Sequence, residues 1–254
     1  MSKTILNCYI EAADAVILRG IDQMKLCAER KENGWFQVLL YSDSCFEYDT
    51  GNLLSDFQLW IDTLDLKATF EKNTNVSLLL EFTITASHVK EEPVPWLDFD
   101  RSFIRKASLF NLSIDVIVNI ESSFDDCSIY SGVYLHLNPL SNSSALDVPS
   151  IQHAAGMMSL ATMKSNYSLY SSDNAWCLAC KSDGLSPETP ICELMNLIKT
   201  PSELCNYSEL NGLESHIDIT CYGIPNNTTV FRLNREFFSF CDMLNIEYCT
   251  LDLR

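Results

Sequence analysis

The chain contains two similar stretches, and this internal repeat constrains its fold more than any other feature of the sequence. Residues 97–118 align without a gap with residues 231–252. The identical pairs are Arg101 with Arg235, Phe103 with Phe237 and Asn111 with Asn245. Similar residues occupy many of the positions between these pairs. The repeat therefore predicts that the chain is built from two related halves.

Each copy has the pattern of a capped helix followed by a strand. Asp100 and Asn234 are residue types whose side-chain oxygens accept hydrogen bonds from the free N–H groups at a helix start. Apolar residues then recur at helical spacing: Phe103, Ile104, Ala107 and Phe110 in the first copy, and Phe237, Phe238, Cys241 and Leu244 in the second. Asn111 and Asn245 follow, where a left-handed residue commonly ends a helix. Alternating apolar residues after each Asn predict a strand.

The repeat extends toward the amino terminus of each half. Alternating residues predict a further strand in each: Leu80, Phe82 and Ile84, and Ile217, Ile219 and Cys221. A helical stripe precedes it: Leu54, Phe57, Trp60 and Ile61, and Ile191, Leu194, Leu197 and Ile198. Earlier still, strands around Trp35 and Trp176 correspond, as do NCYIEA near residue 10 and GVYLHL near residue 135. A compact helical stretch over residues 14–34 has a longer Ser- and Asn-rich counterpart over residues 138–175.

Each half therefore reads as β-α-β-α-β-α-β, and we place the two lobes at residues 1–125 and 126–254. This order of elements predicts an α+β fold in which each lobe has a mostly antiparallel sheet with helices packed on one face. No Pro- or Gly-rich linker separates the halves. We therefore expect the two lobes to contact each other firmly.

The charge balance is the most informative feature of the composition. Seventeen Lys and Arg residues stand against 34 Asp and Glu residues, which gives a formal net charge of −17. Both halves are acidic, so the charge is not confined to a tail. Such a surface repels nucleic acid and anionic membranes and favours fast encounter with a basic partner. Acidity that serves only solubility is the alternative interpretation.

The sequence carries no recognisable catalytic or cofactor motif. It has neither a G-x-G loop for phosphate nor a G-x-S-x-G nucleophile elbow, and its four histidines show no H-x-H or H-x-x-x-H spacing. Cys177 and Cys180 form a C-x-x-C pair, but residues three apart on a strand point to opposite faces, which favours a core strand over a metal site. Neighbouring carboxylates such as Asp98 and Asp100 are explained by solvation and helix capping. We expect no catalytic residue, no metal and no cofactor.

The amino terminus lacks the basic stretch and apolar run of a secretory signal, and no segment has the length of a membrane span. Several of the eleven cysteines lie in apolar strand patterns, where a thiol acts as a small hydrophobic group. These are Cys8, Cys177, Cys180 and Cys221. We therefore expect a cytoplasmic protein with reduced thiols.

The order of elements, with its closing acid-x-x-Phe helix and following strand, resembles a small uncharacterised bacterial domain. That domain occurs singly or in tandem and is sometimes encoded beside contact-dependent or polymorphic toxins. The best match is residues 100–118, which include Asp115. Cys249 is aligned with Asp115 in the second half, which argues against an obligatory catalytic aspartate. The resemblance implies a fold and the context of an immunity protein, and it supplies no active site.

We therefore expect an acidic binding protein, most concretely an immunity protein that neutralises a basic toxin effector domain by protein–protein contact. The candidate partner-binding residues lie in the loop SDSCFEYD and at the junction ESSFDD: Asp43, Glu47, Asp49, Glu121, Asp125 and Asp126. We expect no nucleic-acid or membrane partner, and a monomer or weak dimer.

Two alternatives stay open. A small-ligand binder or enzyme would use the groove between the two lobes, since pockets favour domain interfaces. A structural or adaptor module is the third possibility, because duplicated domains also serve that role.

Overall fold

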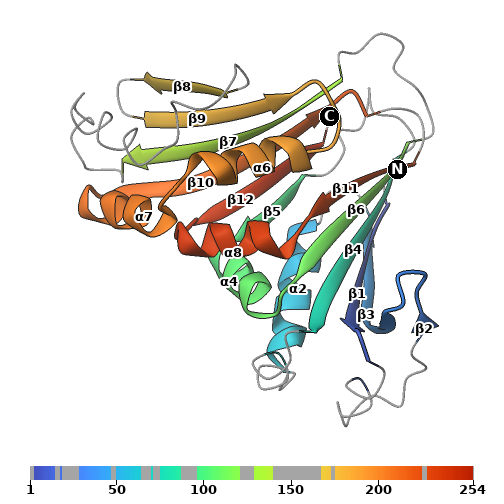
Figure 1. The fold of residues 1–254 in the computed structure, drawn as a ribbon. Coiled ribbons are helices and arrows are strands. Elements are labelled where there is room, and N and C mark those ends of the chain that lie inside the picture. The colour runs from blue at the N-terminus through green and yellow to red at the C-terminus, as the bar shows by residue number, and fades with distance from the viewer. Residues whose placement is uncertain are drawn as a thin grey trace. The chain divides into compact units, whose positions relative to one another are not determined.

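The computed structural model describes residues 3–14, 18, 29–46, 50–63, 70, 75–86, 96–120, 129–139, 167–172, 175–224 and 228–253. Over these residues the chain forms two six-stranded sheets and five helices, which confirms the predicted α+β class (Figure 1). No described helix combines the length and apolar character needed to cross a membrane.

The first sheet has the strand order β11-β6-β4-β1-β3-β2. Its strands are β1 (Lys3–Ala12), β2 (Glu29–Arg30), β3 (Phe36–Phe46), β4 (Val76–Ala86), β6 (Ser113–Ile120) and β11 (Thr228–Leu233). All neighbours pair antiparallel except β4 and β6, which are parallel. Apolar side chains alternate along these strands and are buried on one face, as with Leu6, Cys8 and Ile10 of β1.

The second sheet has the order β5-β12-β10-β7-β9-β8. Its strands are β5 (Leu97–Asp100), β7 (Tyr130–Pro139), β8 (Tyr167–Ser172), β9 (Ala175–Ser182), β10 (Leu213–Tyr222) and β12 (Tyr248–Leu253). Here the single parallel pair is β10 with β12. The two sheets therefore share one plan, in which β7 takes the place of β1, β10 of β4, β12 of β6 and β5 of β11.

Each sheet is completed by a strand from the other half of the chain. β5, from the first half, pairs with β12, and β11, from the second half, pairs with β6. The chain accordingly forms two compact units: residues 1–95, 105–123 and 225–235, and residues 96–104, 124–224 and 236–254. The predicted lobes, 1–125 and 126–254, differ from these units by the two exchanged segments, 96–104 and 225–235, and by residues 124–125 at the boundary. The exchange cannot be recognised from the repeat. The exchanged strands are equivalent in sequence, so either one can form the same hydrogen-bonded ladder.

The described helices are α2 (Thr50–Asp62), α4 (Arg101–Leu109), α6 (Glu188–Leu197), α7 (Pro201–Leu210) and α8 (Arg235–Met243). α6 packs on β7 and β9, and α7 packs on β10, so that the helices of this unit cover one face of its sheet (Figure 1). α2 packs on β3 in the first unit. Phe99 of β5 contributes to the core of the second unit, where its ring lies 5.0 Å from that of Phe103 and 6.1 Å from that of Phe238.

Three of the four predicted helix caps, Asp100, Asn111 and Asn245, are confirmed. The Asp100 carboxylate accepts a hydrogen bond of 2.7 Å from the backbone N–H of Phe103. Asn111 and Asn245 both have positive φ, at 49° and 58°. The next residue in each copy, Leu112 or Ile246, donates its N–H to a carbonyl of the preceding helix, at 2.9 Å and 3.0 Å. The two helices therefore end in the same way, with a left-handed asparagine followed by a backbone hydrogen bond to the helix.

The closing strands depart from the gapless alignment by one residue. Leu80 pairs with Ile114 across β4 and β6, whereas the equivalent Ile217 pairs with Cys249 across β10 and β12. Glu247 is the extra residue in the second copy, and its backbone N–H donates to the Ser215 carbonyl at 2.9 Å. A slip of one residue turns every side chain to the other face. The counterpart of Asp115 is therefore Thr250, and the alignment with Cys249 was wrong.

Two further predictions fall mostly on residues outside the described ranges. They are the helical stretch over residues 14–34 and the Ser- and Asn-rich stretch over residues 138–175. Within the first stretch, Glu29–Arg30 is not helical but forms β2 and pairs with β3. A turn follows, in which Gly34 has a φ of 85°. Only glycine adopts such a conformation without strain.

Candidate functional site

The candidate site lies on the face of the second sheet opposite its apolar core. Side chains alternate along β10, where Ile217 and Ile219 are fully buried and Asp218 and Thr220 are partly exposed. The strand registers align the side chains of this face in rows across the sheet. One row contains His136, His216 and Tyr248. The next contains Tyr134, Asp218, Thr250 and Asp98.

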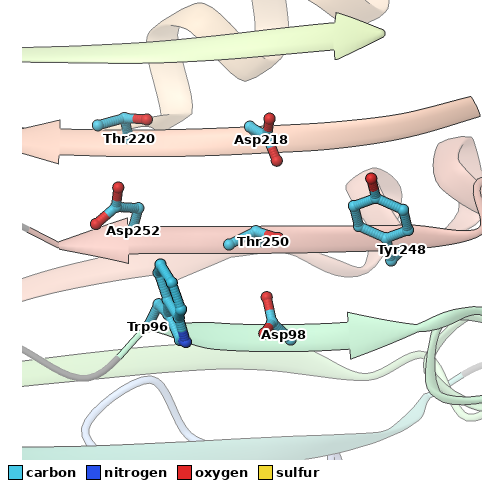
Figure 2. A pocket seen from close by; sticks show the side chains of 7 residues that line it. All are labelled: Trp96, Asp98, Asp218, Thr220, Tyr248, Thr250 and Asp252. Carbon is cyan, nitrogen blue, oxygen red and sulfur yellow. The ribbon is translucent and has the colours of Figure 1, made fainter. Parts of the chain in front are cut away.

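A pocket of about 670 Å³ opens on this face. It is lined by Trp96, Asp98, Asp218, Thr220, Tyr248, Thr250 and Asp252 (Figure 2). Trp96 immediately precedes β5, and the residue is 59% exposed. The lining thus combines three carboxylates, two large aromatic side chains and two threonine hydroxyl groups.

Three aromatic rings stack along the row beside the pocket. The rings of His136 and His216 have centroids 4.5 Å apart and planes 9° from parallel. The ring of Tyr248 lies 4.6 Å from that of His216 on its other side, at 12°. Asp218 is beside the stack, with its Oδ2 3.3 Å from His136 Nε2 and 3.9 Å from His216 Nε2. The pocket and the stack therefore share Asp218 and Tyr248.

The two histidines have opposite electrostatic environments. The hydrogen bond with Asp218, followed by that with Cys177, raises the pKa of His136 to about 9. Burial, followed by the nearby charge of His136, lowers the pKa of His216. At neutral pH the stack therefore contains one imidazolium and one neutral imidazole. Three carboxylates of the pocket lining, those of Asp98, Asp218 and Asp252, lie on the same face as this imidazolium.

The first unit pairs one acid of the equivalent row with an arginine. There the row contains Glu81, Asp115 and Arg232. Arg232 donates Nε–H and Nη2–H to the two oxygens of Asp115, both at 2.6 Å. Such a bidentate pair is a strong charge-assisted interaction. In the second unit Asp98 occupies the position of Arg232, so an acid replaces the cation.

Of the six predicted partner-binding residues, the structure describes Asp43. It lies in β3 rather than in a loop, because β3 continues to Phe46 by pairing with β1 as far as Lys3. Its carboxylate accepts hydrogen bonds from the Tyr41 hydroxyl at 3.1 Å and from the Ser44 N–H at 2.7 Å. Asp43 belongs to the first compact unit, whereas the pocket lies in the second. The other five, Glu47, Asp49, Glu121, Asp125 and Asp126, lie outside the described residues and stay predictions.

Sequence reasoning missed the residues that form this site. His136 and His216 are far apart in the chain and meet only through the pairing of β7 with β10. The available signal was the alternation His216-x-Asp218-x-Thr220, which places three polar side chains on one face of a strand. Asp98 was considered only with Asp100. The structure separates them, since Asp100 caps α4 and Asp98 lines the pocket.

The interpretation of the cysteines is confirmed for the described residues. Cys180 is fully buried in the core, whereas Cys177 approaches His136 Nε2 on the other face with its Sγ at 3.9 Å. The two thiols of the C-x-x-C pair therefore belong to opposite faces of β9. The described cysteines are free, and Cys8 and Cys221 are also fully buried.

Comparisons with known proteins leave the site unassigned. No protein-family model matches the chain, and no curated protein is significantly similar to it. Among solved structures, the "Crystal structure of putative glycine cleavage system transcriptional repressor" aligns with 89% of this chain and 99% of its own, at 10% sequence identity and a TM-score of 0.16. This similarity is too low to indicate a shared fold.

Proposed function

We propose that the chain is a binding protein for a basic protein partner, and that the pocket of the second unit receives a Lys or Arg side chain of that partner. The observation that carries the proposal is the lining of three carboxylates beside Trp96 and Tyr248. Carboxylates pair with a cationic head group, and the faces of aromatic rings attract the same cation.

The contrast between the two units supports this choice of ligand. Asp115 in the first unit is paired with Arg232 of the same chain. The second unit has Asp98 at the position of that arginine. Thr250 takes the place of Asp115, so this row contains the two acids Asp218 and Asp98, which a cationic side chain of a partner would meet.

The exposure of Trp96 and the charge of the chain favour a macromolecular partner over a small cation. An exposed Trp beside charged groups is typical of the residues that contribute most to protein–protein binding. A formal net charge of −17 accelerates encounter with a basic protein at low salt. An immunity protein that blocks a basic toxin in the cytoplasm is the specific form of this proposal. It involves binding and no catalysis.

The test measures binding of an arginine-rich peptide by calorimetry at low and high salt. The pocket variant carries Asp98→Asn, Asp218→Asn and Asp252→Asn. The control variant carries Glu32→Gln, Asp56→Asn and Asp183→Asn, which are exposed and lie outside the pocket lining. Both variants remove three negative charges, so a general effect of charge is the same in both.

We expect the pocket variant to bind the peptide at least about tenfold more weakly than the control variant does. Equal weakening in both variants would show that only the overall charge attracts the peptide. Circular dichroism of both variants checks that the fold is retained.

The proposal of an immunity protein is tested by expressing the product of the adjacent reading frame with and without this chain. If co-expression of this chain does not restore growth, the proposal of an immunity protein is contradicted.

A further inference from the structure

We propose that His136, His216 and Asp218 form a binding site for one divalent transition-metal ion of the zinc class. Three strand positions bring the ligand atoms together: His136 from β7, and His216 and Asp218 from β10. The ligand atoms all lie within 4.8 Å of one another. Asp218 Oδ2 is 3.3 Å from His136 Nε2 and 3.9 Å from His216 Nε2. Ligand atoms around a tetrahedral zinc ion are separated by roughly 3.3 Å.

The donor set selects the class of metal. Two imidazole nitrogens and one carboxylate suit Zn²⁺ and its neighbours in the first transition series, whereas Ca²⁺ and Mg²⁺ prefer ligand sets made of oxygen. Three protein ligands leave a coordination position for water or for a group from a bound partner. Because Asp218 also lines the pocket, that position lies at the pocket's edge.

Surrounding groups can orient both rings. Asn138 Nδ2 lies 3.3 Å from His216 Nδ1. Rotation of the amide by half a turn brings its oxygen to the same place, where it accepts from Nδ1–H and leaves His216 Nε2 with the lone pair that a metal needs. The near-parallel stack holds the two Nε2 atoms on the same side, near Asp218 Oδ2. Coordination therefore requires the His136 ring to tilt toward the metal, and its side chain, 26% exposed, is the freer of the two. The His136 imidazolium must release its Nε2 proton to solvent when the metal binds.

The first unit provides an internal comparison. The ladder positions of His136 and His216 are occupied there by Tyr9 and Leu79, and the position of Asp218 is occupied by Glu81. The first unit thus retains the carboxylate but has neither imidazole. The proposal therefore specifies one metal ion per chain.

The test titrates the full-length, chelator-treated chain with Zn²⁺ by calorimetry and follows its thermal unfolding with and without the metal. We expect one Zn²⁺ per chain and a higher Tm in its presence, because a ligand that binds the folded state stabilises it. His136→Gln lowers the affinity at least about 100-fold, since even the residues that support metal ligands contribute 10–100-fold. His136 does not line the pocket, and its replacement removes a positive charge beside Asp218, so this variant should not weaken the proposed peptide binding.

Controls separate this site from other Zn²⁺ ligands of the chain. His88→Gln and His153→Gln change the other two histidines and should retain the affinity and stoichiometry of the unmodified chain. Asp218→Asn is a second disabling variant, useful if His136→Gln unfolds the protein. Nitrogen NMR of the histidines should show Zn²⁺-dependent shifts at His136 and His216 alone. The absence of saturable binding, or binding that survives both disabling variants, would overturn the proposal.

Discussion

At the scale of single residues, small differences between equivalent positions give the two units different chemistry. Arg232 and Asp98 occupy the same place in their sheets, yet one neutralises a neighbouring acid and the other adds a negative charge. Other equivalent residues have kept one role. Asn111 and Asn245 both end a helix with positive φ, because a short polar side chain tolerates the left-handed region better than most side chains do.

We predict that Asn111→Ala lowers the free energy of unfolding by about 1 kcal/mol, since a Cβ without a polar partner is strained at positive φ. Asn111→Gly adopts this conformation freely and should remain closer to the unmodified chain. Urea unfolding followed by circular dichroism measures both variants. If the glycine variant lost as much stability as the alanine variant, the left-handed conformation would not be what selects asparagine.

At the scale of elements, the exchange of β5 and β11 is the main departure from two independent repeats. Each exchanged strand places two apolar side chains in the core of the recipient sheet: Leu97 and Phe99 of β5, and Phe231 and Leu233 of β11. β5 also introduces Trp96 and Asp98 into the pocket. The pocket is therefore built from both halves of the sequence.

We predict that Phe231→Ala destabilises the first unit by about 3–5 kcal/mol, because a large ring with no exposed surface leaves a cavity. The residue lies in the second half of the sequence but in the first compact unit. Hydrogen exchange should therefore accelerate in β4 and β6 and change little in β10 and β12. The reverse pattern is expected for Phe99→Ala. Faster exchange in β10 and β12 for the Phe231 variant would contradict the strand assignment.

The sequence was sufficient to predict the main helices and strands of each repeat. It predicted neither the strands β2, β5, β8 and β11, nor the helix α7, nor how the elements associate. The caps at Asp100 and Asn111 and the apolar stripes of α4 and α8 are local signals, and the structure confirms them. The exchange has no local signal, because the two strands that trade places are alike. The added residue Glu247 was not recognised, because the alignment matches apolar residues of the two strands both with and without a shift of one residue. The pocket was missed because its acids are contributed by strands that are distant in sequence.

At the scale of the whole molecule, the duplication and the exchange together make each half dependent on the other. A fragment of residues 1–125 contains β6 but not its partner β11. Its own β5 is equivalent to β11, and an unpaired strand edge favours association with another chain. Two copies of the fragment can therefore complete their sheets by exchanging β5.

We predict that fragment 1–125 folds as a homodimer rather than as a monomer. Light scattering coupled to size-exclusion chromatography measures its mass directly. Addition of fragment 126–254 should convert the homodimer to a heterodimer with the strand pairing of the intact chain. A stably folded monomer of the 1–125 fragment would show that the exchange is not needed to complete the first sheet.

The central functional claim is that the pocket of the second unit binds a basic partner. NMR titration of the intact chain with the arginine-rich peptide tests it most directly. The account predicts that the largest shifts occur at the Trp96 indole and in the backbone of residues 98, 218–220 and 248–252, with little change around Arg232. Largest shifts around Asp43 or over residues 121–126 would contradict it, and would place the partner at the acidic segments identified from the sequence.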